Sequence, residues 1–183
     1  MTSKKGARRK AAGGGPAGHR LDAHRAHRKA GAAVITVSST RTQKTDESGA
    51  ILCAAFEEAG HRVLYRAIVK DDVSHVQAAV RDALSMAGVD VVVTSGGTGM
   101  AKGDLTIEAV LPLLDKRADG WGDVFRSVSR EEIGNAAMLT RSVAGTAGGK
   151  WVFAIPGSAG AARTAIAKLI LPELEHMLWE ARR

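Results

Sequence analysis

The chain has 183 residues, of which 45% are hydrophobic and 25% charged, as is usual for a globular domain with a sizeable core. Its apolar runs are far shorter than the roughly 20 residues needed to cross a bilayer, and its beginning does not resemble a signal peptide. A single cysteine, Cys53, excludes an internal disulfide and fits a reducing compartment. We therefore expect a soluble, cytoplasmic protein with no membrane partner.

The net charge of +7 is concentrated at one end of the chain. Residues 1–30 hold nine of the 26 lysines and arginines and one acidic residue, whereas the rest of the chain has a net charge of −1. A basic face on a domain would indicate nucleic acid, but a basic, Gly/Ala-rich arm is more often a solvated extension. We expect a disordered arm at 1–30 and a single α/β domain at 31–183, and nucleic acid is a disfavoured partner.

Short β-branched runs alternate with amphipathic, alanine-rich stretches after Gly31. The pattern predicts strands at 34–37, 63–69, 89–94, 142–147 and 151–155. It predicts helices at 49–59, from Asp71 or Asp72 to 86, at 106–114 with a kink near Pro112, at 121–137 with breaks at Gly122 and Gly134, after Ser158, and from Pro172. Such alternation implies right-handed crossovers and a mostly parallel sheet with helices on both faces.

The loops that follow these strands are expected to meet at one edge of the sheet. They lie at 38–48, 70–72, 95–104 and 156–158. Ligands of open α/β sheets collect beyond the carboxyl ends of the strands, so this edge is the predicted binding site.

The loop Ser95, Gly96, Gly97, Thr98 and Gly99 leaves the most apolar strand. Its three glycines allow positive φ and close backbone approach, and successive free N–H groups form an anion-binding concavity to which Thr98 adds a hydroxyl. The loop is neither a P-loop nor a dinucleotide fingerprint, because the residues that follow lack both patterns. We interpret it as a phosphate-binding loop; a tight turn without a ligand is the alternative.

Aspartates at the same edge of the sheet are candidate ligands for a metal ion. Asp104 follows the glycine loop, where it either caps the next helix, in competition with Thr106, or binds a cation. A carboxylate beside a phosphate loop implies Mg²⁺ if a nucleotide binds, and Asp71 or Asp72 could supply a second carboxylate. Two carboxylates and phosphate oxygens around Mg²⁺ are typical of phosphoryl or nucleotidyl transfer.

The turn Pro156, Gly157 and Ser158 follows the last predicted strand and opens a helix. The start of a helix attracts anions, so this turn is a candidate for a second anionic group. A plain strand-turn-helix junction is the other interpretation.

The sequence from Thr94 to Gly99, followed by Asp104-Leu105-Thr106-Ile107-Glu108-Ala109, resembles the signature of the MoaB/Mog molybdopterin-binding family, to which the gephyrin G domain belongs. The resemblance covers roughly residues 31–181 and includes the segments 36–38, 46–49 and 155–158. The stretches 120–134 and 142–145 are most similar to the MoaB branch.

The resemblance implies a three-layer α/β/α sandwich that assembles as a homotrimer or hexamer. It implies adenylylation of molybdopterin by Mg-ATP with release of pyrophosphate, within molybdenum cofactor biosynthesis, and other proteins of that pathway as partners. Asp71 and Asp104 match the family aspartates that organise Mg-ATP, and both are expected to be catalytic and to bind Mg²⁺. The glycine loop and the 156–158 turn would hold phosphates.

Three positions depart from the family pattern. Gly103 stands where the family usually has arginine, Lys70 replaces a proline, and Ile107 replaces another proline. Lys102 is a candidate substitute for the arginine, although its ammonium lacks the planar fork of a guanidinium. These departures leave a second hypothesis, a non-catalytic molybdopterin-binding or carrier protein. A third is a nucleic-acid protein tethered by residues 1–30.

Overall fold

The computed structural model describes residues 29–183, so all but the last two positions of the predicted arm at 1–30 lie outside the described residues. Six strands form one sheet in the order β2-β1-β3-β6-β5-β4. Strands β2, β1, β3 and β6 are parallel to one another, and β5 is antiparallel to both of its neighbours, β6 and β4. Their bounds are β1 Gly31–Val37, β2 Arg62–Val69, β3 Val91–Ser95, β4 Lys116–Arg117, β5 Val143–Ala147 and β6 Lys150–Ile155.

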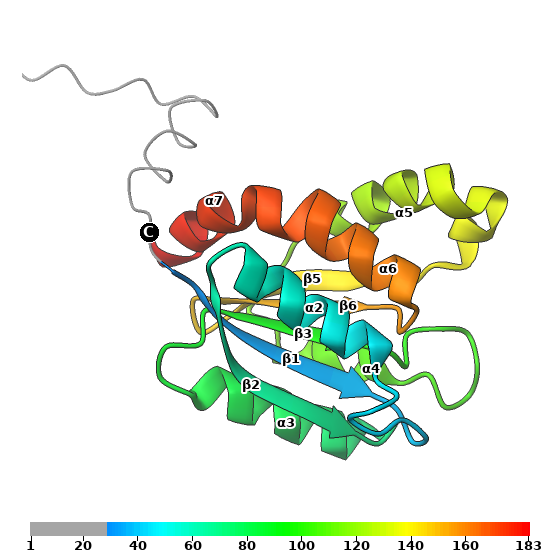
Figure 1. Ribbon diagram of the computed structural model, residues 1–183, viewed down its shortest axis with the longest axis horizontal. Helices are drawn as coiled ribbons and strands as arrows, with labels where there is room; N and C mark the ends of the chain where they lie inside the picture. The colour runs from blue at the N-terminus through cyan, green and yellow to red at the C-terminus, as the bar shows by residue number, and fades with distance from the viewer. Residues whose placement is uncertain (1–28) are drawn as a thin grey trace, which may run out of the picture.

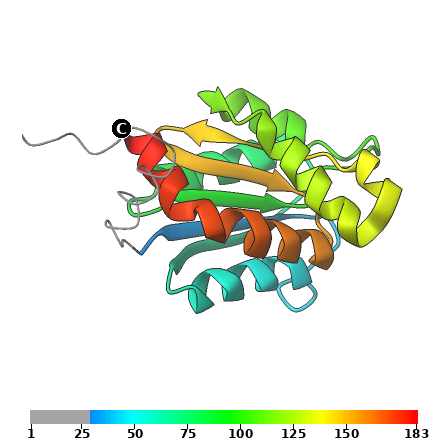
Figure 2. The same ribbon diagram turned by 90° about the horizontal axis from the view of Figure 1, so that it is seen from above.

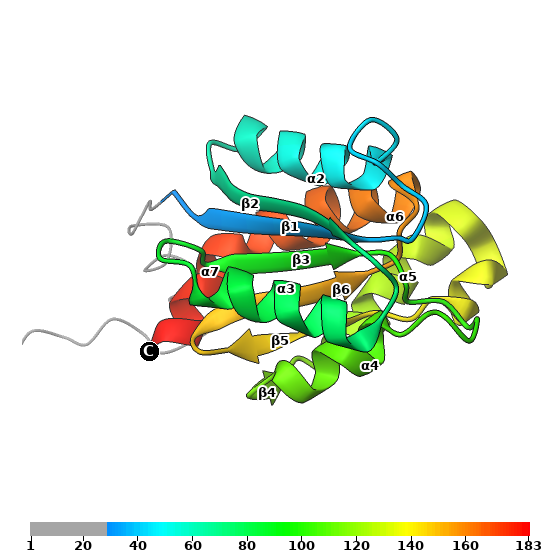
Figure 3. The same cartoon turned by 90° about the horizontal axis from the view of Figure 1, so that it is seen from below.

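Helices cover both faces of the sheet, which confirms the predicted α/β/α fold. One face carries α2 (Glu47–Glu58), α5 (Gly120–Ile133), α6 (Ala159–Thr164) and α7 (Leu171–Arg182), as Figures 1 and 2 show. The other face carries α3 (Val73–Ser85) and α4 (Thr106–Val110), seen in front of the sheet in Figure 3. A π-helical stretch, Ala165–Ile170, joins α6 to α7. None of the helices in residues 29–183 is long and apolar enough to span a membrane.

The core lies on both sides of the central strands. Val91 and Val93 of β3 pack with α2, α5, α6 and α7, whereas Val92 packs with α3 and α4. Because the side chains of a strand alternate between faces, a strand covered on both faces must be apolar throughout. This requirement explains why the central strands read as continuous apolar runs in the sequence.

The structure corrects one local prediction and adds a strand that was not predicted. Helix α5 runs without a break through Gly122, because this glycine lies in the first turn, where backbone N–H groups need no helical partner. Strand β4 was not predicted, since its two exposed residues have no hydrophobic pattern. The predicted break at Gly134 and the predicted kink near Pro112 are both observed. Gly134 ends α5 with φ 60°, and α4 tightens into the 3-10 turn Leu111–Leu113 around Pro112.

Candidate functional site

The predicted loops meet at the carboxyl ends of β1, β2, β3 and β6. The Ser38 amide at the end of β1 donates to the Val69 carbonyl at the end of β2, over 2.8 Å. The Gly96 amide after β3 donates to the Ile155 carbonyl at the end of β6, over 3.0 Å. The segments after four parallel strands therefore lie side by side, as they must to share one ligand.

The glycine loop needs two of its glycines for both conformation and space. Gly96 and Gly97 have φ of 112° and 60°, in the region that residues other than glycine rarely adopt. A Cβ on Gly96 would be 2.2 Å from the Val37 carbonyl oxygen, and one on Gly97 would be 2.4 Å from Oγ1 of Thr106. The chain thus approaches its neighbours here more closely than any other residue type allows.

The 156–158 turn packs directly on the glycine loop. A Cβ on Gly157 would be 2.9 Å from the Cα of Gly96, and Ser95 Oγ donates to the Pro156 carbonyl over 3.4 Å. Ser158 caps α6 by accepting the Ala161 amide over 3.1 Å. The two predicted anion-binding segments are therefore adjacent.

Asp71 lies against the loop and Asp72 does not. Oδ2 of Asp71 accepts from the backbone N–H of Ser39 over 3.2 Å and from its hydroxyl over 3.4 Å. Oδ1 is the atom that a Cβ on Gly97 would meet at 2.7 Å. Asp72 instead caps α3, where hydrogen bonds from Ser74 and then His75 hold the pKa of its carboxyl well below the usual range. The helix cap and the site carboxylate are thus separate residues.

Asp104 closes a turn at the far end of the loop. Its Oδ2 accepts the Ala101 amide over 2.8 Å, and its own N–H donates to the Ala101 carbonyl over 2.9 Å. A Cβ on Gly99 would be 2.7 Å from the same Oδ2. Helix α4 has no side-chain cap, so the alternative that Asp104 or Thr106 caps it is wrong.

Two threonines are buried at the glycine loop, Thr98 within it and Thr106 at the start of α4. Both are almost fully buried, at 2% and 1% exposure. The Thr106 amide donates to the Gly97 carbonyl over 2.8 Å. Its hydroxyl has no hydrogen-bond partner among residues 29–183 and lies against Gly97, on the side of Asp71. Sequence reasoning considered Thr106 only as a helix cap and missed this position.

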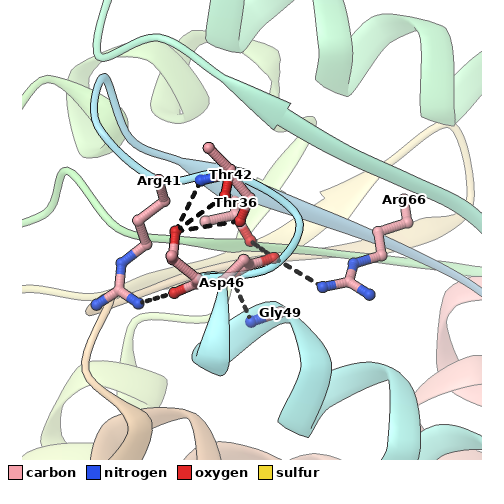
Figure 4. Close-up of polar contacts among 7 residues, drawn as sticks. Thr36, Arg41, Thr42, Asp46, Gly49 and Arg66 are labelled. Atoms are coloured by element: carbon pink, nitrogen blue, oxygen red, sulfur yellow. Dashed lines mark hydrogen bonds and ion pairs between the residues drawn. The ribbon is translucent and has the colours of Figure 1, made fainter.

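A buried carboxylate anchors the 38–48 loop, and it too was not predicted. Asp46 is 2% exposed; Oδ2 accepts from Thr36 Oγ1 over 2.9 Å and from Arg66 Nη2 over 3.0 Å, and Oδ1 accepts the Gly49 amide over 2.9 Å (Figure 4). The network joins β1, β2 and the start of α2. It fixes the loop whose Ser39 binds Asp71.

A cavity of about 190 Å³ opens beside the 156–158 turn, between α5 and α6. Hydrogen bonds from Lys168 and then Thr164 keep the pKa of Glu132, in its wall, below the ordinary value. The cavity is therefore a partly polar pocket that carries a charged carboxylate at neutral pH. Its lining is Phe125, Ser129, Glu132, Ile133, Thr140, Pro156, Ser158, Gly160, Ala161 and Thr164.

Arg141 is bound to the protein at the edge of the loop. Nη1 donates to the Gly99 carbonyl over 2.9 Å, and Nη2 forms an ion pair with Glu108 of α4. Partial burial is the largest single effect on Glu108 and raises its pKa. The hydrogen bond from Arg141, a backbone hydrogen bond and the positive charge of Arg141 together outweigh it, and the pKa lies below its ordinary value. Glu108 is therefore ionised at neutral pH.

These features define an α/β protein with a glycine-rich loop at the carboxyl ends of parallel strands, two carboxylates against that loop and a pocket beside it. Residues 33–176 match the family model described as "Probable molybdopterin binding domain". The chain belongs to this family of molybdenum cofactor biosynthesis proteins.

Its relatives are similar over most of their length. The chain is 52% identical over 151 residues to molybdenum cofactor biosynthesis protein B of Bacillus cereus, covering 82% of this chain and 89% of that one. A crystal structure of a protein of the same name has a TM-score of 0.83 at 50% identity, covering 85% and 98% of the two chains. The tungsten cofactor synthesizing protein MoaB of Pyrococcus furiosus has a TM-score of 0.78 at 38% identity, covering 85% and 99%.

Proposed function

We propose that the protein binds molybdopterin at this edge of the sheet and adenylylates it with Mg-ATP, releasing pyrophosphate. One observation carries the proposal: two carboxylates, Asp71 and Asp104, lie against the glycine loop at Gly97 and Gly99. A phosphate-binding loop beside paired carboxylates suits a nucleotide held through a divalent cation. Membership of the molybdopterin-binding family supports the choice of the second substrate.

The two carboxylates suit Mg²⁺. Each has one oxygen, Oδ1, that accepts no hydrogen bond from any donor in residues 29–183, while Oδ2 is held by backbone amides. Carboxylate oxygens are preferred ligands of this ion, which usually takes only one or two of them together with phosphates and water. When bound, Mg²⁺ would neutralise the charge on the ATP phosphates. Asp71 and Asp104 are the residues that would hold it.

The rest of the site suits two anionic substrates. The amides of the glycine loop and the start of α6 at Ser158 face the same edge and favour phosphate groups. The cavity between α5 and α6 adjoins the 156–158 turn, so a substrate whose phosphate lies on that turn can place its ring system in the cavity. We assign this cavity to the pterin end of molybdopterin.

The proposed reaction is one displacement at phosphorus. A phosphate oxygen of molybdopterin attacks the α-phosphorus of ATP, a new P–O bond forms, and the bond to the pyrophosphate oxygen breaks, with the electron pair leaving on pyrophosphate. The protein contributes position and charge balance, the principal means by which phosphoryl-transfer enzymes act. Asp71 and Asp104 would hold the cation, and the loop amides would orient the phosphates.

Pyrophosphate release is the direct test. Full-length protein mixed with molybdopterin and Mg-ATP should release pyrophosphate, in parallel with an established family enzyme. Asp104→Ala should lower kcat/KM by about 100-fold or more, the scale of losing an electrostatic stabiliser of a transition state. Circular dichroism and a thermal melt check that the variant folds. No pyrophosphate from wild type, with release by the established enzyme, refutes the adenylylation.

A non-catalytic molybdopterin-binding or carrier protein remains the second candidate, favoured by Gly103, Lys70 and Ile107 at family positions that usually hold arginine and proline. Titration separates the two, because only the enzyme requires tight binding of Mg-ATP. Binding of pterin with no measurable binding of ATP identifies a carrier.

We also propose that the protein self-associates, as the homotrimer or hexamer that the resemblance implies. Four of the five exposed large hydrophobic side chains in residues 29–183 lie on α5 or on the 3-10 segment after it. Clustered apolar exposure marks interaction surfaces. Sedimentation should give three or six times the monomer mass, and Met138→Lys, at a residue 79% exposed, should lower it. The four are Val124, Ile133, Met138 and Leu139.

A further inference from the structure

We propose that Arg141 is a positioning residue that sets the direction of the anion-binding amides in the glycine loop. The guanidinium joins three segments that are distant in sequence. It comes from the segment before β5, donates to the Gly99 carbonyl of the loop, and pairs with Glu108 on α4. A solvent-exposed arginine without a structural role would need no contact with the loop backbone.

The consequence follows from peptide geometry. In a trans peptide the carbonyl and the following N–H point in opposite directions. Because Arg141 holds the Gly99 carbonyl, the N–H of Met100 is directed away from Arg141. This amide donates to no group among residues 29–183, so it is available to a ligand.

The neighbouring peptide is fixed in the same manner by a different donor. The Thr106 amide at the start of α4 binds the Gly97 carbonyl, and the N–H of Thr98 accordingly points the other way. The Thr98 amide likewise donates to no group in the described part of the chain. The carbonyls of Gly97 and Gly99 are therefore held by Thr106 and Arg141, respectively, and the N–H groups of the same two peptides, on Thr98 and Met100, are left for an anion.

Glu108 keeps the guanidinium in place for this task. An arginine side chain has several rotatable bonds, and a carboxylate on its second nitrogen restricts them. The side chains are 30% and 48% exposed, so the ion pair itself contributes little to stability. The ion pair instead orients the guanidinium: because Glu108 binds Nη2, Nη1 is directed toward the Gly99 carbonyl.

The inference rests on the proposed function for the identity of the anion, a nucleotide phosphate. The test uses the full chain with Arg141→Ala, Arg141→Lys and Glu108→Gln. Arg117→Ala is the matched control, since Arg117 is also paired with a carboxylate, Asp119, but lies at the opposite end of the sheet. Hydrogen exchange over peptides spanning 96–104, Mg-ATP affinity by calorimetry, and kcat and KM are measured for each.

Arg141→Ala should speed exchange in 96–104 and weaken Mg-ATP binding by about tenfold, the loss expected for one charge-assisted hydrogen bond. Arg141→Lys should recover part of both, because an ammonium can replace one of the two contacts but not the fork. Glu108→Gln should fall between wild type and Arg141→Ala. Arg117→Ala should change neither quantity.

Unchanged exchange in 96–104 for both Arg141 variants, or equal changes in Arg117→Ala, overturns the positioning role. If Arg141→Ala does not fold, Arg141→Lys and Glu108→Gln decide the matter by the same readouts. Failure of the proposed function is recognised separately, as absence of pyrophosphate from wild type. In that case altered exchange in Arg141→Ala would still establish that Arg141 orders the loop.

Discussion

Gly157 touches the glycine loop at Gly96, so closely that a Cβ on Gly157 would be 2.9 Å from the Gly96 Cα. The backbones of the turn after β6 and the loop after β3 thus approach each other closely at these two glycines. Gly157→Ala should push the two backbones apart, lower the free energy of unfolding by about 1–3 kcal/mol as overpacking does, and weaken Mg-ATP binding. Urea denaturation and calorimetry measure both effects.

The control for this substitution is Gly103→Ala. Gly103 lies in the same region, a Cβ added to it would meet no atom within 4 Å beyond its chain neighbours, and it is not among the glycines with positive φ. Its substitution should leave stability unchanged or raise it by up to about 1 kcal/mol, because the unfolded chain loses freedom. Equal stabilities for the two variants would contradict the close contact at Gly157.

Gly97→Ala should be more severe. Its φ of 60° already disfavours alanine, and the added methyl would be 2.4 Å from Thr106 Oγ1 and 2.7 Å from Asp71 Oδ1. Strained backbone of this kind costs about 1–3 kcal/mol, to which the clash adds. Because Asp71 must move, turnover should fall further than stability alone explains. Pyrophosphate release at a temperature where the variant is fully folded separates the two effects.

The sequence was sufficient for the features that depend on local pattern. The strand ends, the glycine loop and Asp104 are each signalled within a few residues, and the parallel sheet then dictates which loops meet. Local signals failed where a contact joins distant segments. No local sequence pattern predicts the ion pair of Asp46 with Arg66, 20 residues away. None predicts the hydrogen bond of Arg141 to the Gly99 carbonyl, 42 residues away. Residue type and position alone do not distinguish Asp71 from Asp72. The family resemblance selects Asp71, and in the structure Asp72 is the N-cap of α3.

Asp46→Ala should destabilise the fold by about 2–3 kcal/mol. The substitution removes the cap on the Gly49 amide, the acceptor of the Thr36 hydroxyl and the partner of Arg66, as Figure 4 shows. Loss of a cap costs about 1 kcal/mol, and a buried polar group left without a partner costs about 1–3 kcal/mol. Chemical denaturation measures the change.

Asp72→Ala is the comparison for Asp46→Ala. Asp72 caps α3 on an exposed surface, so its removal leaves no buried polar group without a hydrogen-bond partner. Its loss of stability should be clearly smaller. Similar losses for the two variants would mean that the Asp46 network contributes no more than an ordinary helix cap.

His61 should make the protein less stable as the pH falls below neutral. Burial lowers the pKa of its imidazole from the ordinary 6.5, against a smaller opposing effect of Glu175, and Nδ1 accepts the Ala30 amide over 3.2 Å, which requires the unprotonated nitrogen. The unfolded chain therefore binds a proton more readily than the folded one, so this contribution to stability is present above pH 6.5 and is lost as the pH drops through and below that value. Thermal melts from pH 8 to pH 5 on wild type and His61→Gln test it. The melting temperature of wild type should fall more steeply in this range, and parallel curves would show that His61 does not titrate differently on folding.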